Sequence, residues 1–450
     1  MIISTLSIAA VAAVVAPAQA APDIAGAWEG RLSVAGQSIR IVFNVAPDGT
    51  TTMDSPDQGA RGIPAQGSVE GRNVTFAVTA ISGRFEGVLS EDGRTLTGAL
   101  VQGGMTAPMV LERGEVAAGP SRPQTPRPPF PYEAREVAFD NPAAPGVRLA
   151  GTLTVPEGAG PFPAAILITG SGPQDRDETI LDHKAFAVWA DALTRRGVAV
   201  LRYDDRGVGA STGNFGTATS ADFATDVRAA LDWLGQQPGI DRERIGLIGH
   251  SEGGTIAPLV AQDGGDVAWI VTLAGPTVSG GAIIEEQAHL IRVAAGATPE
   301  QDAALGALQA RLMRAVADNA DDPAAVSSAV SAILVEAGQT PAQAASAGAQ
   351  MSSPWYRWSV AHDPAASLRA VDVPMLALYG GKDLQVSPDQ NVPPLRTYKP
   401  DAEIVVLPNL NHLLQPAETG LMQEYGTIET TLDPEAISTV VEWVVARSNL

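Results

Sequence analysis

A proline-rich segment most constrains how this chain can fold. Residues 120–131 contain six prolines in twelve positions. Proline lacks the backbone N–H that a helix interior or a central strand needs, and such a segment favours extended polyproline II structure. We therefore predict two domains, residues 22–115 and 132–450, joined by a Pro-rich linker over residues 116–131.

The region before the linker has the pattern of a small all-β domain. Residues 39–45 and 74–78 show the alternation of half-buried strands. Turn-forming residues separate such runs at intervals of about ten residues, which predicts a small antiparallel barrel or sandwich. The region contains no histidine and no recognisable catalytic cluster, so we interpret it as an accessory domain.

After the linker, strand-like and helix-like runs alternate, which is typical of an α/β protein with a parallel sheet. Residues 163–169 and 198–203 are predicted to be strands, and the amphipathic runs 184–196 and 221–236 are predicted to be helices. Residues 277–368 interrupt this order and are Ala-rich with a helical pattern. Because this insertion is too long for an ordinary connection, we predict a helical cap over the strand ends.

The first twenty residues are predicted to be a secretory signal peptide. Residues 2–15 are mostly apolar, and Ala18-Gln19-Ala20 fits the small-x-small pattern of a cleavage site. This apolar stretch is shorter than the ~20 residues of a membrane-spanning helix. No Lys or Arg lies near Met1, which departs from the usual signal, and an uncleaved anchor is the alternative. We expect cleavage after Ala20 and export to the periplasm or the medium.

Composition excludes several functional classes. Fifty acidic residues against 29 basic ones give a net charge of −21, which opposes binding to nucleic acid or to an anionic membrane surface. The chain has no cysteine, which excludes disulfides, a cysteine nucleophile and cysteine-ligated metals. It also has no Walker-type phosphate-binding motif and no H-E-x-x-H motif, so we expect no cofactor and no metal.

Two serines, Ser211 and Ser251, lie in a G-x-S-x-G pattern. A nucleophile elbow requires a strand, one tight turn and a helix that begins at once. The strand-like run 245–248 precedes Ser251, and a helix is predicted to begin near Gly253. Ser211 instead lies in a loop rich in Gly, Thr and Asn. We therefore predict that Ser251 is the nucleophile.

A serine nucleophile needs a histidine base and an acid that orients this base. In a doubly wound sheet, reactive groups gather at the carboxyl ends of the strands. Of the five histidines, only His412 follows a late predicted strand, residues 403–407. Asp383 follows the preceding predicted strand, residues 373–379, after a Gly-Gly-Lys turn. The order Ser251, Asp383, His412 is that of the α/β-hydrolase fold.

Several segments match the motifs of a known enzyme family. They are Gly170-Ser171-Gly172-Pro173-Gln174-Asp175-Arg176-Asp177-Glu178, the Tyr203–Ser211 loop, the Gly249–Gly254 elbow, residues 381–386 and Ser353-Pro354-Trp355-Tyr356. In these motifs the chain resembles the α/β-hydrolase superfamily and is similar to bacterial serine carboxylesterases over about residues 132–450. The resemblance implies this fold, an esterase activity and the same triad. It points to the backbone N–H of Ser171 as one oxyanion-hole donor. The second donor is predicted to be the N–H of Glu252, directly after the nucleophile.

Two further features are candidates for substrate binding. Arg176 either contacts a polar group of the substrate or pairs with the acidic residues beside it. In the predicted cap, Trp355, Tyr356 and Trp358 lie within four residues of one another. These aromatic side chains either line an acyl or alcohol pocket or form the core of the cap.

Together these residues predict a serine hydrolase that cleaves carboxylic esters of short to medium acyl chain, with a small-molecule ester as its partner. His412 takes the proton from Ser251, and an acyl-enzyme forms and is hydrolysed. Three alternatives remain: a serine peptidase, a thioester or lactone hydrolase with the same triad, and a binding protein that acts through the β domain.

Overall fold

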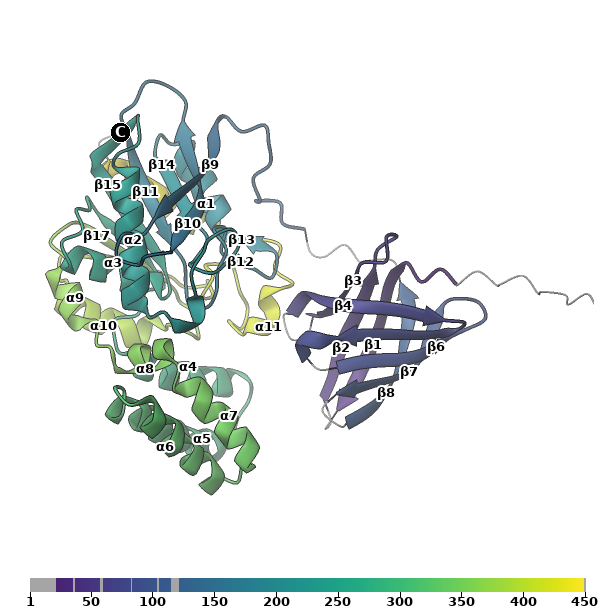
Figure 1. Ribbon diagram of the computed structural model, residues 1–450. Helices are drawn as coiled ribbons and strands as arrows, with labels where there is room; N and C mark the ends of the chain where they lie inside the picture. Colours follow the sequence, from purple (N-terminus) through teal and green to yellow (C-terminus); the bar gives the residue numbers. More distant parts are fainter. Residues whose placement is uncertain are drawn as a thin grey trace, which may run out of the picture. The chain divides into compact units, whose positions relative to one another are not determined.

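In a computed structural model, the chain divides into two compact units, residues 1–119 and 120–450 (Figure 1). The structure describes residues 22–34, 37–56, 60–81, 83–102, 105–114 and 121–448. The predicted signal peptide, residues 1–20, lies outside the described residues, as does the first part of the predicted linker.

The first unit is a closed barrel of eight strands, β1 to β8. Each strand pairs antiparallel with the next, and β1 also pairs with β8, which closes the barrel. The strands are Gly26–Val34, Gln37–Val45, Thr51–Ser55, Ala60–Glu70, Asn73–Val78, Gly83–Leu89, Thr95–Gln102 and Met105–Gly114, with a short 3-10 turn at Thr79–Ile81. The prediction of an all-β domain is confirmed, and of its two forms the barrel is the correct one.

Aromatic side chains form the core of the barrel. Phe43 and Phe76 stack with their ring centres 4.6 Å apart, and Phe85 lies 6.2 Å from each. The buried Trp28 donates its indole N–H to the carbonyl of Ile24 at 2.8 Å. The alternation seen in the sequence places these rings on the inner face, because successive side chains of a strand point to opposite sides.

The second unit contains an eight-stranded sheet of the order β18-β17-β16-β15-β11-β14-β10-β9. From β14 to β18 neighbouring strands are parallel, and β10 is antiparallel to both β14 and β9. The strands are β9 Tyr132–Asp140, β10 Arg148–Pro156, β11 Phe162–Ile168, β14 Ala199–Tyr203, β15 Ile240–His250, β16 Ile270–Leu273, β17 Met375–Gly380 and β18 Glu403–Leu407. Runs such as 164–168 are apolar throughout because both faces of these strands are buried. The predicted parallel α/β sheet is confirmed.

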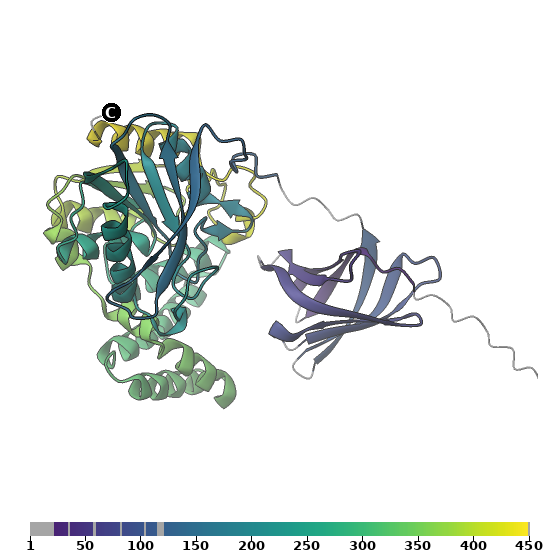
Figure 2. The same cartoon turned by 45° about the horizontal axis from the view of Figure 1, so that its top comes forward.

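Helices cover both faces of this sheet (Figure 2). On one face, α2 and α3 pack into an apolar core with β11 and β15, and on the other face α1 and α12 pack with the same strands. The helices outside the cap are α1 Ala185–Thr194, α2 Ser220–Leu234, α3 Gly253–Gln262, α10 Pro388–Tyr398, α11 Met422–Tyr425 and α12 Pro434–Arg447, with a 3-10 turn at Phe215–Thr217 and a small hairpin of β12 Thr179–Ile180 and β13 His183–Lys184. Among the described residues, no helix is both long and apolar enough to cross a membrane.

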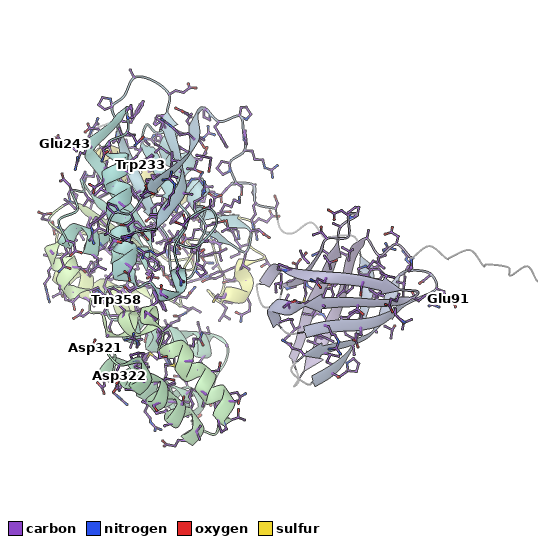
Figure 3. All side chains as sticks on the ribbon, in the orientation of Figure 1. Glu91, Trp233, Glu243, Asp321, Asp322 and Trp358 are labelled. Carbon is purple, nitrogen blue, oxygen red and sulfur yellow. The ribbon has the colours of Figure 1, made fainter. Side chains whose placement is uncertain are left out.

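The segment between β16 and β17 is helical, as predicted for the cap. Its helices are α4 Gly280–Ala294, α5 Pro299–Asp318, α6 Pro323–Glu336, α7 Pro341–Met351, α8 Pro354–Ala361 and α9 Ala365–Ala370. From α5 to α8, each begins with proline directly after a Thr, Asp or Ser cap, where a missing N–H costs nothing. Figure 3 shows Trp358 of α8 nearer the sheet than Asp321 and Asp322 at the turn between α5 and α6.

The second half of the predicted linker is fixed to the second unit. Arg122 donates to the carbonyl groups of Leu181, Gly426 and Ile428 at 2.9, 2.9 and 2.6 Å. Gln124 accepts the backbone N–H of Thr431 at 2.6 Å. From residue 121 onward, therefore, the Pro-rich segment is part of the second unit. The side chains between its prolines attach it to the loop before α12.

Candidate active site

Ser251 lies in a strained turn between β15 and α3. Its φ angle is +50°, in the left-handed region that side chains other than glycine rarely adopt. A Cβ atom on Gly249 would lie 2.0 Å from the carbonyl oxygen of Gly253, and one on Gly253 would lie 2.2 Å from that of Ile168. Both positions therefore require glycine, and the pattern around Ser251 is the elbow geometry that exposes a nucleophile at a strand end.

Asp383 and His412 form a buried hydrogen-bonded pair. They are 2% and 5% exposed, and His412 Nδ1 lies 2.8 Å from Asp383 Oδ2. The other carboxylate oxygen, Oδ1, accepts the backbone N–H groups of Gln385 at 2.7 Å and Val386 at 2.9 Å. The carboxylate is thus held from one side, while its free oxygen faces the imidazole. With Nδ1 engaged, Nε2 of His412 is the nitrogen that remains for a nucleophile.

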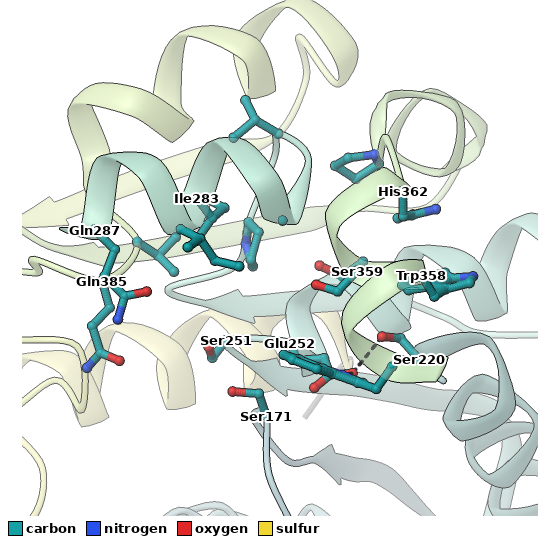
Figure 4. A pocket seen from close by; sticks show the side chains of 18 of the residues that line it. Ser171, Ser220, Ser251, Glu252, Ile283, Gln287, Trp358, Ser359, His362 and Gln385 are labelled. Atoms are coloured by element: carbon teal, nitrogen blue, oxygen red, sulfur yellow. Dashed lines mark hydrogen bonds between the residues drawn. The ribbon is translucent and has the colours of Figure 1, made fainter. Parts of the chain in front are cut away.

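A cavity of about 160 Å³ brings the predicted residues together, since Ser171, Ser251, Glu252 and His412 all line it. Figure 4 shows Ser171, Ser251 and Glu252 on one side of the cavity, with the cap residues Ile283 and Ser359 across from them. Within the described part of the chain, the backbone N–H groups of Ser171 and Glu252 donate to no protein acceptor. Two free donors therefore flank the nucleophile, as an oxyanion hole requires.

The cap supplies the apolar wall of the cavity. Trp355 and Trp358 line it, together with Val278, Ile283, Ile284 and Pro364. Trp358 stacks on His362, which also lines the cavity, with ring centres 4.2 Å apart. Two of the three predicted cap aromatics thus reach the site, because the Ser-Pro-Trp segment begins α8 at the edge of the cavity.

Glu252 takes part in the site through its side chain as well as through its backbone N–H. Its Oε1 accepts hydrogen bonds from Ser220 Oγ at 2.6 Å and from Trp355 Nε1 at 2.8 Å. Burial raises the pKa of the Glu252 carboxyl above its usual value, and these two hydrogen bonds lower it in part. The contact with Trp355 ties the cap to the residue next to the nucleophile, which the sequence analysis did not anticipate.

Two of the candidate substrate contacts, Arg176 and Tyr356, are not among the residues that line this cavity. Arg176 does not line the cavity. Its Nε and Nη2 donate to the two carboxylate oxygens of Asp204, at 3.1 and 2.9 Å, and its Nη1 donates to Glu136. Its acidic partners are therefore not its chain neighbours, and its role is to hold the loop. Tyr356 does not line the cavity and packs against the cap core, where its hydroxyl lies 4.0 Å from Met313 Sδ.

Sequence analysis also missed a buried pair beside the triad. Glu178 Oε1 lies 2.8 Å from His250 Nδ1, and His250 Nε2 lies 3.1 Å from the carbonyl oxygen of His412. Burial lowers the pKa of His250, but the charge of Glu178 and the hydrogen bonds outweigh this and raise it overall. The available signal was the last residue of the Gly170–Glu178 motif, an acidic side chain in a segment already matched to the active-site loop.

These features define a class of protein. A parallel sheet, a serine elbow at one strand end and an Asp–His pair after two later strands define a serine hydrolase with the α/β-hydrolase fold. Residues 145–412, more than half of the chain, match the family described as X-Pro dipeptidyl-peptidase (S15 family). The protein belongs to this family and is an enzyme. The resemblance to the α/β-hydrolases is thereby confirmed.

The individual proteins to which the chain is similar match it over only part of its length. The chain is 26% identical over 304 residues to esterase EstD of Thermotoga maritima, covering 66% of this chain and 65% of that esterase, slightly less than two thirds of its length. It is 34% identical over 112 residues to the uncharacterized protein Rv2307c of Mycobacterium tuberculosis, covering 25% of this chain and 36% of that protein. Among solved structures it is similar to esterase Pf2001 of Pyrococcus furiosus, with 16% identity, a TM-score of 0.43, and 70% and 92% of the two chains covered.

Proposed function

We propose that this protein hydrolyses carboxylic esters of short to medium acyl chain through an acyl-enzyme on Ser251. The observation that carries this proposal is the buried Asp383–His412 pair, whose imidazole lines the same cavity as the elbow serine. His412 accepts the proton of Ser251, and the hydroxyl oxygen attacks the ester carbonyl. The N–H groups of Ser171 and Glu252 stabilise the oxyanion, and His412 then activates the water that releases the acid.

The dimensions of the cavity support a small acyl or alcohol group. A volume of about 160 Å³ is close to that of an engineered protein cavity of ~150 Å³ that holds one benzene molecule. The apolar cap side chains favour a hydrocarbon group there. Long acyl chains exceed this volume unless the cap moves.

The comparisons favour two candidate substrates. The relative EstD is called an esterase, whereas the family description names a peptidase that acts after an X-Pro pair. Both reactions pass through an acyl-enzyme on the same serine, and they differ in the acyl group, in the leaving group and in what the cavity must bind. We favour the ester because the chain is similar to that esterase over 304 residues, 66% of its length.

The test compares substrates on the wild type and on Ser251→Ala. We expect hydrolysis of p-nitrophenyl acetate and butyrate at pH 8, slower hydrolysis of the laurate, and a loss of kcat of at least ~10³-fold in the variant. An X-Pro p-nitroanilide is the parallel substrate. If only the anilide is cleaved, the enzyme is a peptidase. If neither substrate is cleaved but a thioester is, the ester proposal fails while the triad is retained. Cleavage of a lactone alone would restrict the ester substrate to cyclic esters and overturn the proposed open-chain acyl group.

We also propose that residues 1–20 direct export of the enzyme. The support is the apolar run followed by Ala18-Gln19-Ala20. N-terminal sequencing of the protein from the periplasm or medium is expected to begin at Ala21. A chain that begins at Met1 and stays in the cytoplasm would overturn this proposal.

A further inference from the structure

One buried ion pair outside the triad contacts both the loop of the oxyanion hole and the loop that carries the triad histidine. Glu178 and His250 are 2% and 5% exposed. Glu178 Oε1 accepts the backbone N–H of Gly170 at 2.7 Å, directly before Ser171, and lies 2.8 Å from His250 Nδ1. On the other side, His250 Nε2 lies 3.1 Å from the carbonyl oxygen of His412. The pair thus links the oxyanion loop, the elbow and the loop that carries the triad histidine.

The two contacts of His250 require a particular protonation state. A carboxylate and a backbone carbonyl are both acceptors, and a neutral imidazole carries only one N–H. Only the imidazolium form donates to Glu178 and to the carbonyl of His412 at the same time. The negative charge of Glu178 is therefore what keeps both links intact.

Stability alone does not account for this arrangement. A buried ion pair is commonly no more stabilising than apolar side chains of the same volume. Glu178 also has a φ angle of +48°, and such strain persists where the surrounding structure imposes it. A Cβ atom on Gly170 would lie 3.1 Å from Glu178 Oε1 and 3.3 Å from His250 Nδ1. The oxyanion loop is therefore packed directly against the pair.

We propose that Glu178 and His250 are a positioning pair, which holds the Ser171 loop and the His412 loop in register on the two sides of Ser251. Neither residue lines the cavity, so the pair acts through the backbone of the groups that touch the substrate. This inference rests on the proposed function, because it concerns the donors and the base of that same reaction.

Two variants separate the links. Glu178→Gln keeps the shape and one acceptor oxygen but removes the charge. Either a neutral His250 then loses one of its two partners, or the amide turns its NH₂ group to Nδ1 and leaves the N–H of Gly170 without its acceptor. His250→Asn retains a donor near the Nδ1 position and loses the contact with His412. We expect each variant to lower kcat 10- to 100-fold, as misplacement of catalytic groups by ~1 Å does, with KM changed less than ~3-fold. Because both substitutions disrupt the same hydrogen-bonded pair, kcat of the double variant should be within ~3-fold of kcat of the more impaired single variant.

Labelling of Ser251 by a fluorophosphonate gives a second readout that needs no ester turnover. The labelled fraction counts the folded sites, and the labelling rate reports how well the nucleophile and the oxyanion donors are placed. A wild type that labels but hydrolyses no ester would overturn the proposed function and leave the pair testable by this rate.

His183→Gln is the matched control. His183 is also a buried histidine with two hydrogen bonds, to Thr431 Oγ1 at 2.9 Å and to the carbonyl of Tyr425 at 3.2 Å, and it does not line the cavity. We expect its labelling rate to equal that of the wild type. Labelling rates and kcat of the Glu178 and His250 variants within twofold of this control would overturn the proposal. Effects that multiply in the double variant, or that fall on KM alone, would do the same.

Discussion

Replacing Asp383 by asparagine tests whether this residue sets the tautomer of His412. In the structure, Asp383 Oδ1 accepts two backbone N–H groups, from Gln385 and Val386, and Oδ2 faces His412 Nδ1. An asparagine has one oxygen and one NH₂ group. If its oxygen keeps the two backbone donors, its NH₂ group faces the imidazole. Nδ1 then has to accept, the proton moves to Nε2, and His412 can no longer serve as the base.

The cost of avoiding this tautomer can be worked out from the same contacts. Turning the amide around restores an acceptor for Nδ1 but leaves the backbone N–H groups of Gln385 and Val386 without theirs, in a site where Asp383 is 2% exposed. Each buried unsatisfied donor costs about 1–3 kcal/mol, so two cost about 2–6 kcal/mol. At 1.4 kcal/mol per factor of ten, Asp383→Asn should lower kcat/KM by about 30- to 10⁴-fold.

The measurement is kcat/KM for a short p-nitrophenyl ester, with the thermal midpoint of the same sample. Asp383→Ala is the matched control, because it removes the orienting oxygen without forcing a donor onto Nδ1. We expect Asp383→Asn to be at least as impaired as the alanine variant while melting closer to the wild type. Activity of the asparagine variant within fivefold of the wild type would show that another group orients the histidine.

Three further outcomes follow from single contacts. Ser211 Oγ donates to the carbonyl of Asp204 at 2.7 Å and accepts a backbone N–H at 2.9 Å, so Ser211→Ala should lower the free energy of unfolding by about 1–3 kcal/mol with kcat/KM retained. A loss of activity comparable to that of a triad variant would mean that the wrong serine was chosen. Trp355→Phe removes a donor to Glu252 and should lower the free energy of unfolding in urea by a similar amount. An unchanged urea midpoint would contradict that contact. Burial, and then the charge of Arg122, lower the pKa of His183 to about 4. The unfolded state, with a histidine pKa of about 6.5, therefore binds the proton first as the pH falls from 7 to 4.5. His183→Gln should reduce the acid loss of stability over that interval by up to about 2.5 kcal/mol, and an unchanged slope would contradict the shifted pKa.

The fold and the triad could be predicted because their signals are local. The elbow needs glycine at Gly249 and Gly253 because a Cβ atom at either position would clash with the backbone. Any sequence that forms this turn is subject to the same constraint. Asp383 and His412 each lie in the loop after a strand that reads as apolar, and parallel strands bring their carboxyl ends to one edge of the sheet. For the same reason, the helical insertion between two strands could be predicted to cover that edge.

The polar contacts between segments could not be predicted in this way, and the Gly170–Glu178 motif shows why. In the sequence its alternating charges suggest pairs between neighbours. In the structure the loop turns the four side chains apart. Asp175 accepts from the backbone and hydroxyl of Thr179 at 3.0 and 2.7 Å, Arg176 binds Asp204, Asp177 binds Arg202, and Glu178 binds His250.

The partners of Arg176, Asp177 and Glu178 lie outside the motif, at the ends of β14 and β15. Which of them a charge reaches depends on backbone angles that the residue types do not specify. The motif is therefore better understood as a set of anchors for the oxyanion loop than as a substrate-binding sequence. On this view, exchanging Arg176 for lysine should loosen the loop, because a lysine cannot bind both oxygens of Asp204 in the forked geometry seen here. The loss should then appear in kcat for every ester alike, whereas a residue that binds substrate would change the preference among esters.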